Sequence, residues 1–134
     1  MHNIIHPSNW APTKGYSAGV LASGNPLFIA GQIGWDVNQQ FTTDDMVEQF
    51  GYAFDHVLAV LKEAGGSPEH LTEMTIYVTD LDEYRGRLRE LGAVWRPRFG
   101  RHYPAMALVG VSGLVERRAK VEVQARAVLP ITKD

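Results

Sequence analysis

The sequence contains no cysteine, which excludes a disulfide framework, a zinc–thiolate site and a catalytic thiol. It has no apolar run approaching the roughly 18 residues that a membrane-spanning helix needs. Residues 1–12 also lack the basic start and apolar segment of a secretory signal. We therefore expect a cytoplasmic protein without a membrane partner.

A strong excess of charge of one sign is absent as well. The chain has 13 Lys and Arg against 15 Asp and Glu, so its formal net charge is −2, and no global basic field would attract nucleic acid. The 5 histidines do not follow a metal-ligand spacing, and no metal site is predicted. Arg85, Arg89 and Arg96 would form a stripe on one helix, which is usually a solvated face; phosphate or RNA binding is the less favoured alternative.

What is present fits one domain spanning residues 1–134, a length that can bury about two thirds of its unfolded surface. Residues 1–15, rich in Asn, Pro and Ser, are predicted to be an irregular lead-in. Residues 17–22 and 27–30 are predicted to form a hairpin around the turn signal Ser-Gly-Asn-Pro. A short third strand is expected over residues 39–42.

Two helices are predicted by their apolar spacing. The first covers residues 43–64, with Thr43 as its cap and two glycines directly after it. The second begins after Asp80, which forms a capping box with Glu83, and ends before Pro97.

Three further strands are predicted at residues 74–79, 105–111 and 120–129, the last with strict alternation of apolar and polar residues. The resulting order, β-β-(β)-α-β-α-β-β, indicates an α+β fold in which two helices cover one face of a sheet. Tyr16, Leu108 and Val128 are expected on the opposite face, where they favour self-association.

Several short stretches, taken in order, resemble the Rid (YjgF, reactive-intermediate deaminase) family over nearly the whole chain. The stretches are Gly15-Tyr16-Ser17, residues 27–34 (LFIAGQIG), residues 49–65, residues 75–80 (TIYVTD), Tyr103-Pro104-Ala105 and Val121-Glu122-Val123. The resemblance implies a chorismate-mutase-like fold and a homotrimer with a central barrel. It also implies clefts between subunits where enamines or imines of small organic molecules are hydrolysed, without metal or cofactor.

The same resemblance assigns roles to particular residues. Glu122 corresponds to the glutamate that handles the attacking water, and Tyr16 to a tyrosine that lines the cleft. The backbone of Ala30 and Gly31 corresponds to a segment that contacts the substrate. Most relatives have serine where Ala30 stands, so one hydroxyl is missing.

Met106 departs from the family pattern. Family members that hydrolyse amino-acid imines have an arginine there, which pairs with the substrate carboxylate, and methionine suits an uncharged or apolar ligand instead. Arg101 and His102, just before the Tyr-Pro-Ala segment, are candidates to replace the lost anchor.

These features favour an imine or enamine deaminase-like hydrolase whose substrate is not the usual amino-acid-derived imine, or whose carboxylate is met by another arginine. A ring-cleavage product of an aromatic compound is a further candidate substrate. The alternative from a different class is a non-catalytic binder of a small molecule.

Overall fold

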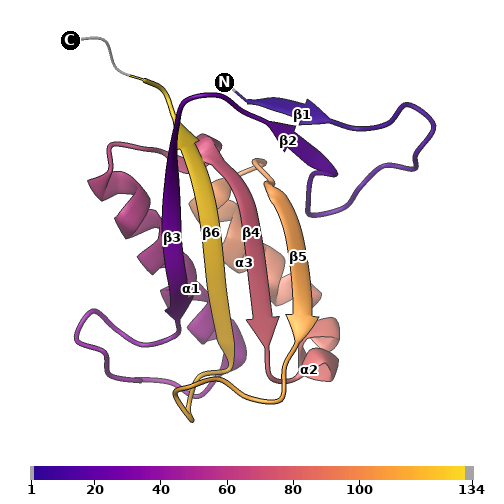
Figure 1. Ribbon diagram of the computed structural model, residues 1–134. Coiled ribbons are helices and arrows are strands. Elements are labelled where there is room, and N and C mark those ends of the chain that lie inside the picture. Colours follow the sequence, from indigo (N-terminus) through magenta and orange to yellow (C-terminus); the bar gives the residue numbers. More distant parts are fainter. Residues whose placement is uncertain (1, 132–134) are drawn as a thin grey trace.

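The computed structural model describes residues 2–131, which form a four-stranded sheet, helices packed on one of its faces, and a separate two-stranded sheet (Figure 1). The strands are β1 (Asn3–Ile5), β2 (Gly19–Leu21), β3 (Asn25–Ile33), β4 (Leu71–Val78), β5 (Ala105–Gly110) and β6 (Val121–Leu129). The helices are α1 (Met46–Glu63), a 3₁₀ turn (Pro68–His70), α2 (Leu81–Gly86) and α3 (Leu88–Phe99). None of the helices in this described range is long and apolar enough to cross a bilayer.

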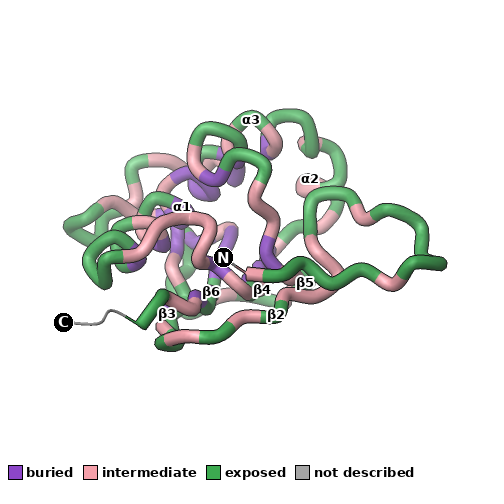
Figure 2. Tube along the Cα trace, turned by 90° about the horizontal axis from the view of Figure 1, so that it is seen from above, coloured by how far each residue is buried: buried purple, intermediate pink, exposed green. Residues whose placement is uncertain are grey.

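The main sheet has the order β3-β6-β4-β5, with β6 antiparallel to both neighbours and β4 parallel to β5. Buried residues concentrate between this sheet and the helices, whereas the outer side of the sheet is more exposed (Figure 2). The predicted α+β class and the helices on one face are confirmed. The core consists of alternate residues of β4 and β6, joined by Ile29 and by the buried faces of α1 and α3: Met46, Phe50, Ala53, Phe54, Val57, Leu61, Leu91, Trp95 and Phe99.

The predicted N-terminal hairpin, in which residues 17–22 pair with residues 27–30, is wrong. β2 pairs with β1 in an antiparallel ladder, and β3 instead pairs with β6. The lead-in therefore contains a strand, which local composition could not indicate because its partner is 14 or more residues away. The strand expected at residues 39–42 is also absent from the described chain: Asp36 Oδ1 accepts the N–H groups of Asn38 and Gln40, which closes a loop.

The first helix begins later than predicted. Asp45, not Thr43, is the cap residue, because its carboxylate accepts the N–H of Glu48 at 3.0 Å. Thr43 supports the cap by accepting the N–H of Asp45 at 3.0 Å. The helix ends as expected, before Gly65, which has φ +83°.

The second predicted helix is two helices that meet at Arg87. Asp80 caps α2 as predicted and accepts the N–H of Glu83 at 3.0 Å. The predicted end before Pro97 is wrong, since α3 continues to Phe99. Burial of Phe99 against the core favours this extra turn over the break that proline favours locally.

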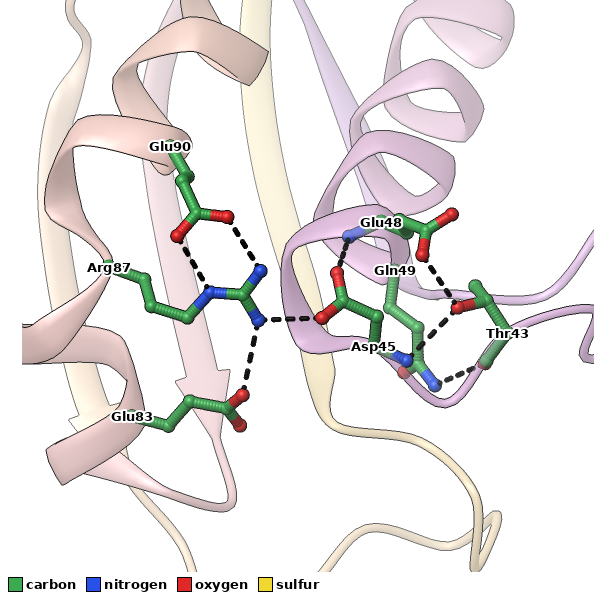
Figure 3. Close-up of polar contacts among 7 residues, drawn as sticks. All are labelled: Thr43, Asp45, Glu48, Gln49, Glu83, Arg87 and Glu90. Carbon is green, nitrogen blue, oxygen red and sulfur yellow. Dashed lines mark hydrogen bonds and ion pairs between the residues drawn. The ribbon is translucent and has the colours of Figure 1, made fainter.

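Arg87 joins the start of α3 to the start of α1 through three carboxylates (Figure 3). Its guanidinium donates to Asp45 at 2.6 Å, to Glu83 at 3.2 Å and to Glu90 at 2.7 Å. The hydrogen bond from Arg87 holds the pKa of Asp45 below its usual range, and the N–H of Glu48 adds to this effect. Arg87 likewise lowers the pKa of Glu90.

Replacing Arg87 by methionine should make stability less sensitive to acid. A carboxyl group whose pKa is lowered on folding stabilises the native state above its unfolded pKa, and this contribution disappears as the pH falls through the folded pKa. The native free energy of unfolding should therefore fall from about pH 5 downward, where Asp45 and Glu90 begin to protonate in the unfolded chain while their pKa values in the folded protein remain lower. In R87M this fall should be smaller, as measured by urea unfolding at a series of pH values.

The matched control is Arg85→Met, which removes an exposed ion pair of 3.5 Å with Asp82 on α2. Exposed pairs of this kind contribute little, so R85M should follow the native pH profile. Parallel profiles for the native protein and R87M would show that the cluster around Arg87 does not couple folding to protonation.

Candidate functional site

A cavity of about 440 Å³ lies on the helix side of the sheet edge, between β5, α3 and the segment that precedes β2. That segment is attached to β5 by a parallel bridge between Ser17 and Ala105, in which the N–H of Ser17 donates to the carbonyl of Pro104 at 3.0 Å. This attachment places Tyr16 in the cavity wall, beside Met106.

The walls are mainly aromatic and aliphatic. Trp95 stacks on Tyr103 with ring centroids 5.5 Å apart and planes 5° apart, and both line the cavity. Met106 and Leu108 contribute from β5, because they pair with the inward-facing Met74 and Ile76 of β4. The expectation that Leu108 faces away from the helices is therefore wrong.

The cavity is lined by two positively charged residues, Lys14 and Arg96. None of its lining residues carries a carboxylate. Neither cation makes an ion pair or a side-chain hydrogen bond with another residue in the described range 2–131. Tyr84 also lines the cavity, and burial raises the pKa of its phenol, which keeps that group neutral. A ligand in this space would meet apolar surface and positive charge.

A second group of predicted site residues lies on the open face of the sheet. The pairing of β3 with β6 is irregular between Ile29 and Gln32, so that Ala30 and Gly31 form a bulge. Glu122 lies directly over this bulge: a Cβ atom at Gly31 would overlap Oε2 of Glu122 and lie 2.8 Å from its Cδ. The Glu122 carboxylate makes no ion pair or hydrogen bond within the described part of the chain.

The predicted residues thus fall into two groups on opposite faces of one sheet. Tyr16 and Met106 line the cavity on the helix side, whereas Glu122, Ala30 and Gly31 meet on the open side. Arg101 is exposed and lines neither place. His102 uses its Nε2 atom to contact the carbonyl of Leu71 at 2.8 Å, which ties this loop to the start of β4.

Among residues 2–131, no group of three or more His, Asp or Glu side chains is arranged to hold a metal ion. The two groups of residues supply a carboxylate, tyrosines and unpaired cations.

The sheet order, the helices on one face and the edge cavity define an α+β protein of the chorismate-mutase-like class. A family model described as endoribonuclease L-PSP matches residues 7–129. A RutC family protein of Aquifex aeolicus is 34% identical over 130 residues, covering 96% of this chain and 99% of the relative. The chain belongs to the Rid/YjgF (endoribonuclease L-PSP) family, as its motifs predicted.

Solved structures agree with this assignment. A Rid-family protein of unknown function from Yersinia pestis is similar with a TM-score of 0.85 at 26% identity, covering 96% of this chain and 98% of that one. RidA from the Antarctic bacterium Psychrobacter sp. is similar with a TM-score of 0.68, also at 26% identity, over 89% and 92% of the two chains.

The sequence did not indicate that Lys14, Trp95 and Arg96 line the cavity. The sequence pattern predicts Arg96 only as part of an arginine stripe on a helix. The signal that could have found it is its spacing of eight residues from Leu88 and four from Gly92, since helical residues four apart share a face and all three line the cavity.

Proposed function

We propose that this protein hydrolyses the C=N bond of an imine, formed directly or from an enamine, in a cleft completed between two subunits of a homotrimer. Membership of the Rid family supports the reaction class. The observation that carries the proposal is the unpaired Glu122 carboxylate over the bulge at Ala30 and Gly31. Because the cavity lies on the opposite face of the same sheet, a neighbouring subunit has to bring the two groups together.

The open face of the sheet has a composition that supports this assembly. Phe28 on β3 is 67% exposed, and its ring lies 5.3 Å from the guanidinium carbon of Arg126 on β6. In the proposed assembly, a neighbouring subunit would cover this exposed ring. In the proposed trimer, these faces line the central barrel.

The chemistry requires a positioned water and a route for its proton. Glu122 would accept a proton as the water attacks the electrophilic imine carbon, giving a carbinolamine. Transfer of a proton to nitrogen then expels ammonia, and the carbonyl product remains. Tyr16, in the cavity wall, would orient the substrate by its hydroxyl group, and the backbone at Ala30 and Gly31 would contact it from the neighbouring subunit.

Replacing Glu122 by glutamine should reduce imine hydrolysis by about a hundredfold or more, because the amide cannot accept the proton of the attacking water. The measurement uses imines generated in place by an amino-acid oxidase, from small polar to bulky aromatic, with the keto acid or ammonia as the readout. Since Glu122 makes no hydrogen bond or ion pair within residues 2–131, E122Q should keep the native unfolding midpoint.

Gln124→Glu, two residues further along the same strand face, is the control for a change of charge on β6 and should retain native turnover. Equal turnover by the native protein and E122Q across the whole panel would overturn the assignment of Glu122.

A non-catalytic binder is the second candidate function, and Met106 is the observation that favours it. Its side chain lies in the cavity wall where amino-acid imine deaminases of the family have arginine, so the usual anchor for a carboxylate is missing at that position. Ligand binding that is unaffected by E122Q, in a protein that accelerates none of the imines, would favour this second function.

RNA binding has less support. The predicted stripe is divided between two helices, since Arg85 lies on α2, where it pairs with Asp82, and Arg89 and Arg96 lie on α3. Arg87, Arg98, Arg118 and Arg126 each form an ion pair with an acidic side chain as well. A surface that follows a phosphate backbone needs cations that are not already paired.

A further inference from the structure

We propose that the helix-side cavity binds a molecule with an aromatic or bulky apolar body and a carboxylate, and that Arg96 of α3 pairs with that carboxylate. The inference rests on the proposed function only in treating the bound molecule as the substrate. It assigns the anion-binding role to a helix residue instead of the strand position occupied by Met106.

The charge of the lining residues carries the first step. Arg96 and Lys14 are the charged residues in a wall that is otherwise apolar or neutral, and no acidic side chain lines the cavity. Three other arginines on or between α2 and α3 are paired: Arg85 with Asp82, Arg87 with three carboxylates, and Arg98 with Asp55 at 2.8 Å. The side chain of Arg96 has no such partner among residues 2–131.

The local backbone makes room for this guanidinium. A Cβ atom added at Gly92 would lie 3.1 Å from Nη1 of Arg96, so the guanidinium rests against the helix where a larger residue would displace it. Gly92 costs helix stability relative to alanine, but it keeps Arg96 close to the cavity. An arginine held in this way can offer two N–H groups to a carboxylate.

The apolar walls define the rest of the ligand. Trp95 and Tyr103 form a stacked pair, and Leu88, Leu91 and Met106 add aliphatic surface. A volume of about 440 Å³ exceeds what a three-carbon acid needs and lies in the usual range for small-molecule sites. Met106 is flexible and polarizable, which suits contact with an aromatic ring.

The indole of Trp95 supplies a further indication of a polar ligand atom. Its Nε1–H is buried and has no hydrogen-bond acceptor among the described residues, although Trp95 borders the cavity. Buried donors normally have a partner. An oxygen atom of the ligand that reached this group would satisfy it.

The test measures binding of two stable probes, so that it does not depend on turnover. 3-Phenylpropionate carries the carboxylate and the ring, and 3-phenylpropionamide has the same shape without the charge. Titration calorimetry should show the carboxylate binding about ten- to a hundredfold more tightly than the amide, as a charge-assisted pair predicts. Arg96→Met should remove this difference and leave the affinity for the amide unchanged.

Arg89→Met is the matched control, because Arg89 is an exposed arginine of the same helix that does not line the cavity. R89M should bind both probes as the native protein does. Equal affinity of the native protein for the two probes, no binding of either, or equal losses in R96M and R89M would overturn the inference. Arg96-dependent binding by a protein that hydrolyses no imine would uphold the inference and reject the hydrolase.

Discussion

Co-expressing two inactive variants should restore about a third of the native activity in purified mixed trimers, if the site is shared between subunits of a trimer. One variant is E122Q, which lacks the proposed base on the open face of the sheet. The other is Gly92→Phe, whose side chain would fill the cavity on the helix side. Each variant alone should be nearly inactive toward the imine that the native protein hydrolyses fastest.

The recovery follows from the geometry of a single chain. Glu122 and the cavity lie on opposite faces of one sheet. In the proposed trimer, each complete cleft would therefore take its cavity from one subunit and its glutamate from a neighbour. In a mixed trimer one cleft pairs the intact cavity of E122Q with the intact glutamate of G92F. Random assembly makes about three quarters of the trimers mixed, and one cleft in three works in each.

Co-expression of the two variants with different tags, followed by two-step purification, isolates the mixed trimers for the assay. The control mixes the two variants after each has assembled separately, which should give no recovery unless subunits exchange. If purified mixed trimers show only the summed activity of the parents, the two groups do not cooperate across an interface, and the site has to lie within one chain.

Much of the main sheet and its helix layer could be predicted because the signals are local. The strict alternation in residues 121–129 puts Val121 and Val123 in the core and Glu122 on the other face, as observed. The apolar spacing of the first helix and the capping role of Asp80 were equally readable. These features depend on residues within one or two turns of each other.

Two of the failures involve distant partners. β2 pairs with β1, because pairing is decided by which strand edges meet in three dimensions and not by the nearest turn signal. The prediction that Leu108 faces away from the helices is wrong because β5 has no alternation of polar and apolar residues. Its register comes from parallel pairing with β4.

The candidate site was predictable in part for the same reason. Family motifs singled out Glu122, Tyr16 and Met106, but the cavity is assembled from five separate segments, and nothing local indicates that Lys14 and Arg96 share it. The separation of Glu122 from Met106 by the sheet likewise follows only from the strand order.

Replacing Gln49 by leucine should lower the free energy of unfolding by about 3–5 kcal/mol, because three buried hydrogen bonds are lost although the side chain keeps a similar size. Gln49 is fully buried in α1, and its amide donates to the carbonyls of Thr43 at 3.0 Å and Arg118 at 2.9 Å. Its Oε1 accepts the N–H of Lys120 at 2.7 Å. Leucine would leave these three backbone groups without a partner.

The consequence extends to the proposed site, because Lys120 directly precedes β6 and Gln49 therefore holds the start of the strand that carries Glu122. Urea unfolding at one fixed protein concentration measures the loss. The control is Gln40→Leu, the same change at an exposed loop residue, whose free energy of unfolding should stay within about 0.5 kcal/mol of the native value. An unfolding free energy for Q49L as close to native as that of Q40L would mean that water replaces all three bonds. Gly34→Ala tests the same contact from the other side, since a Cβ there would lie 2.5 Å from Cγ of Gln49 and 2.8 Å from its Cα, and it should destabilise the fold even with Gln49 intact.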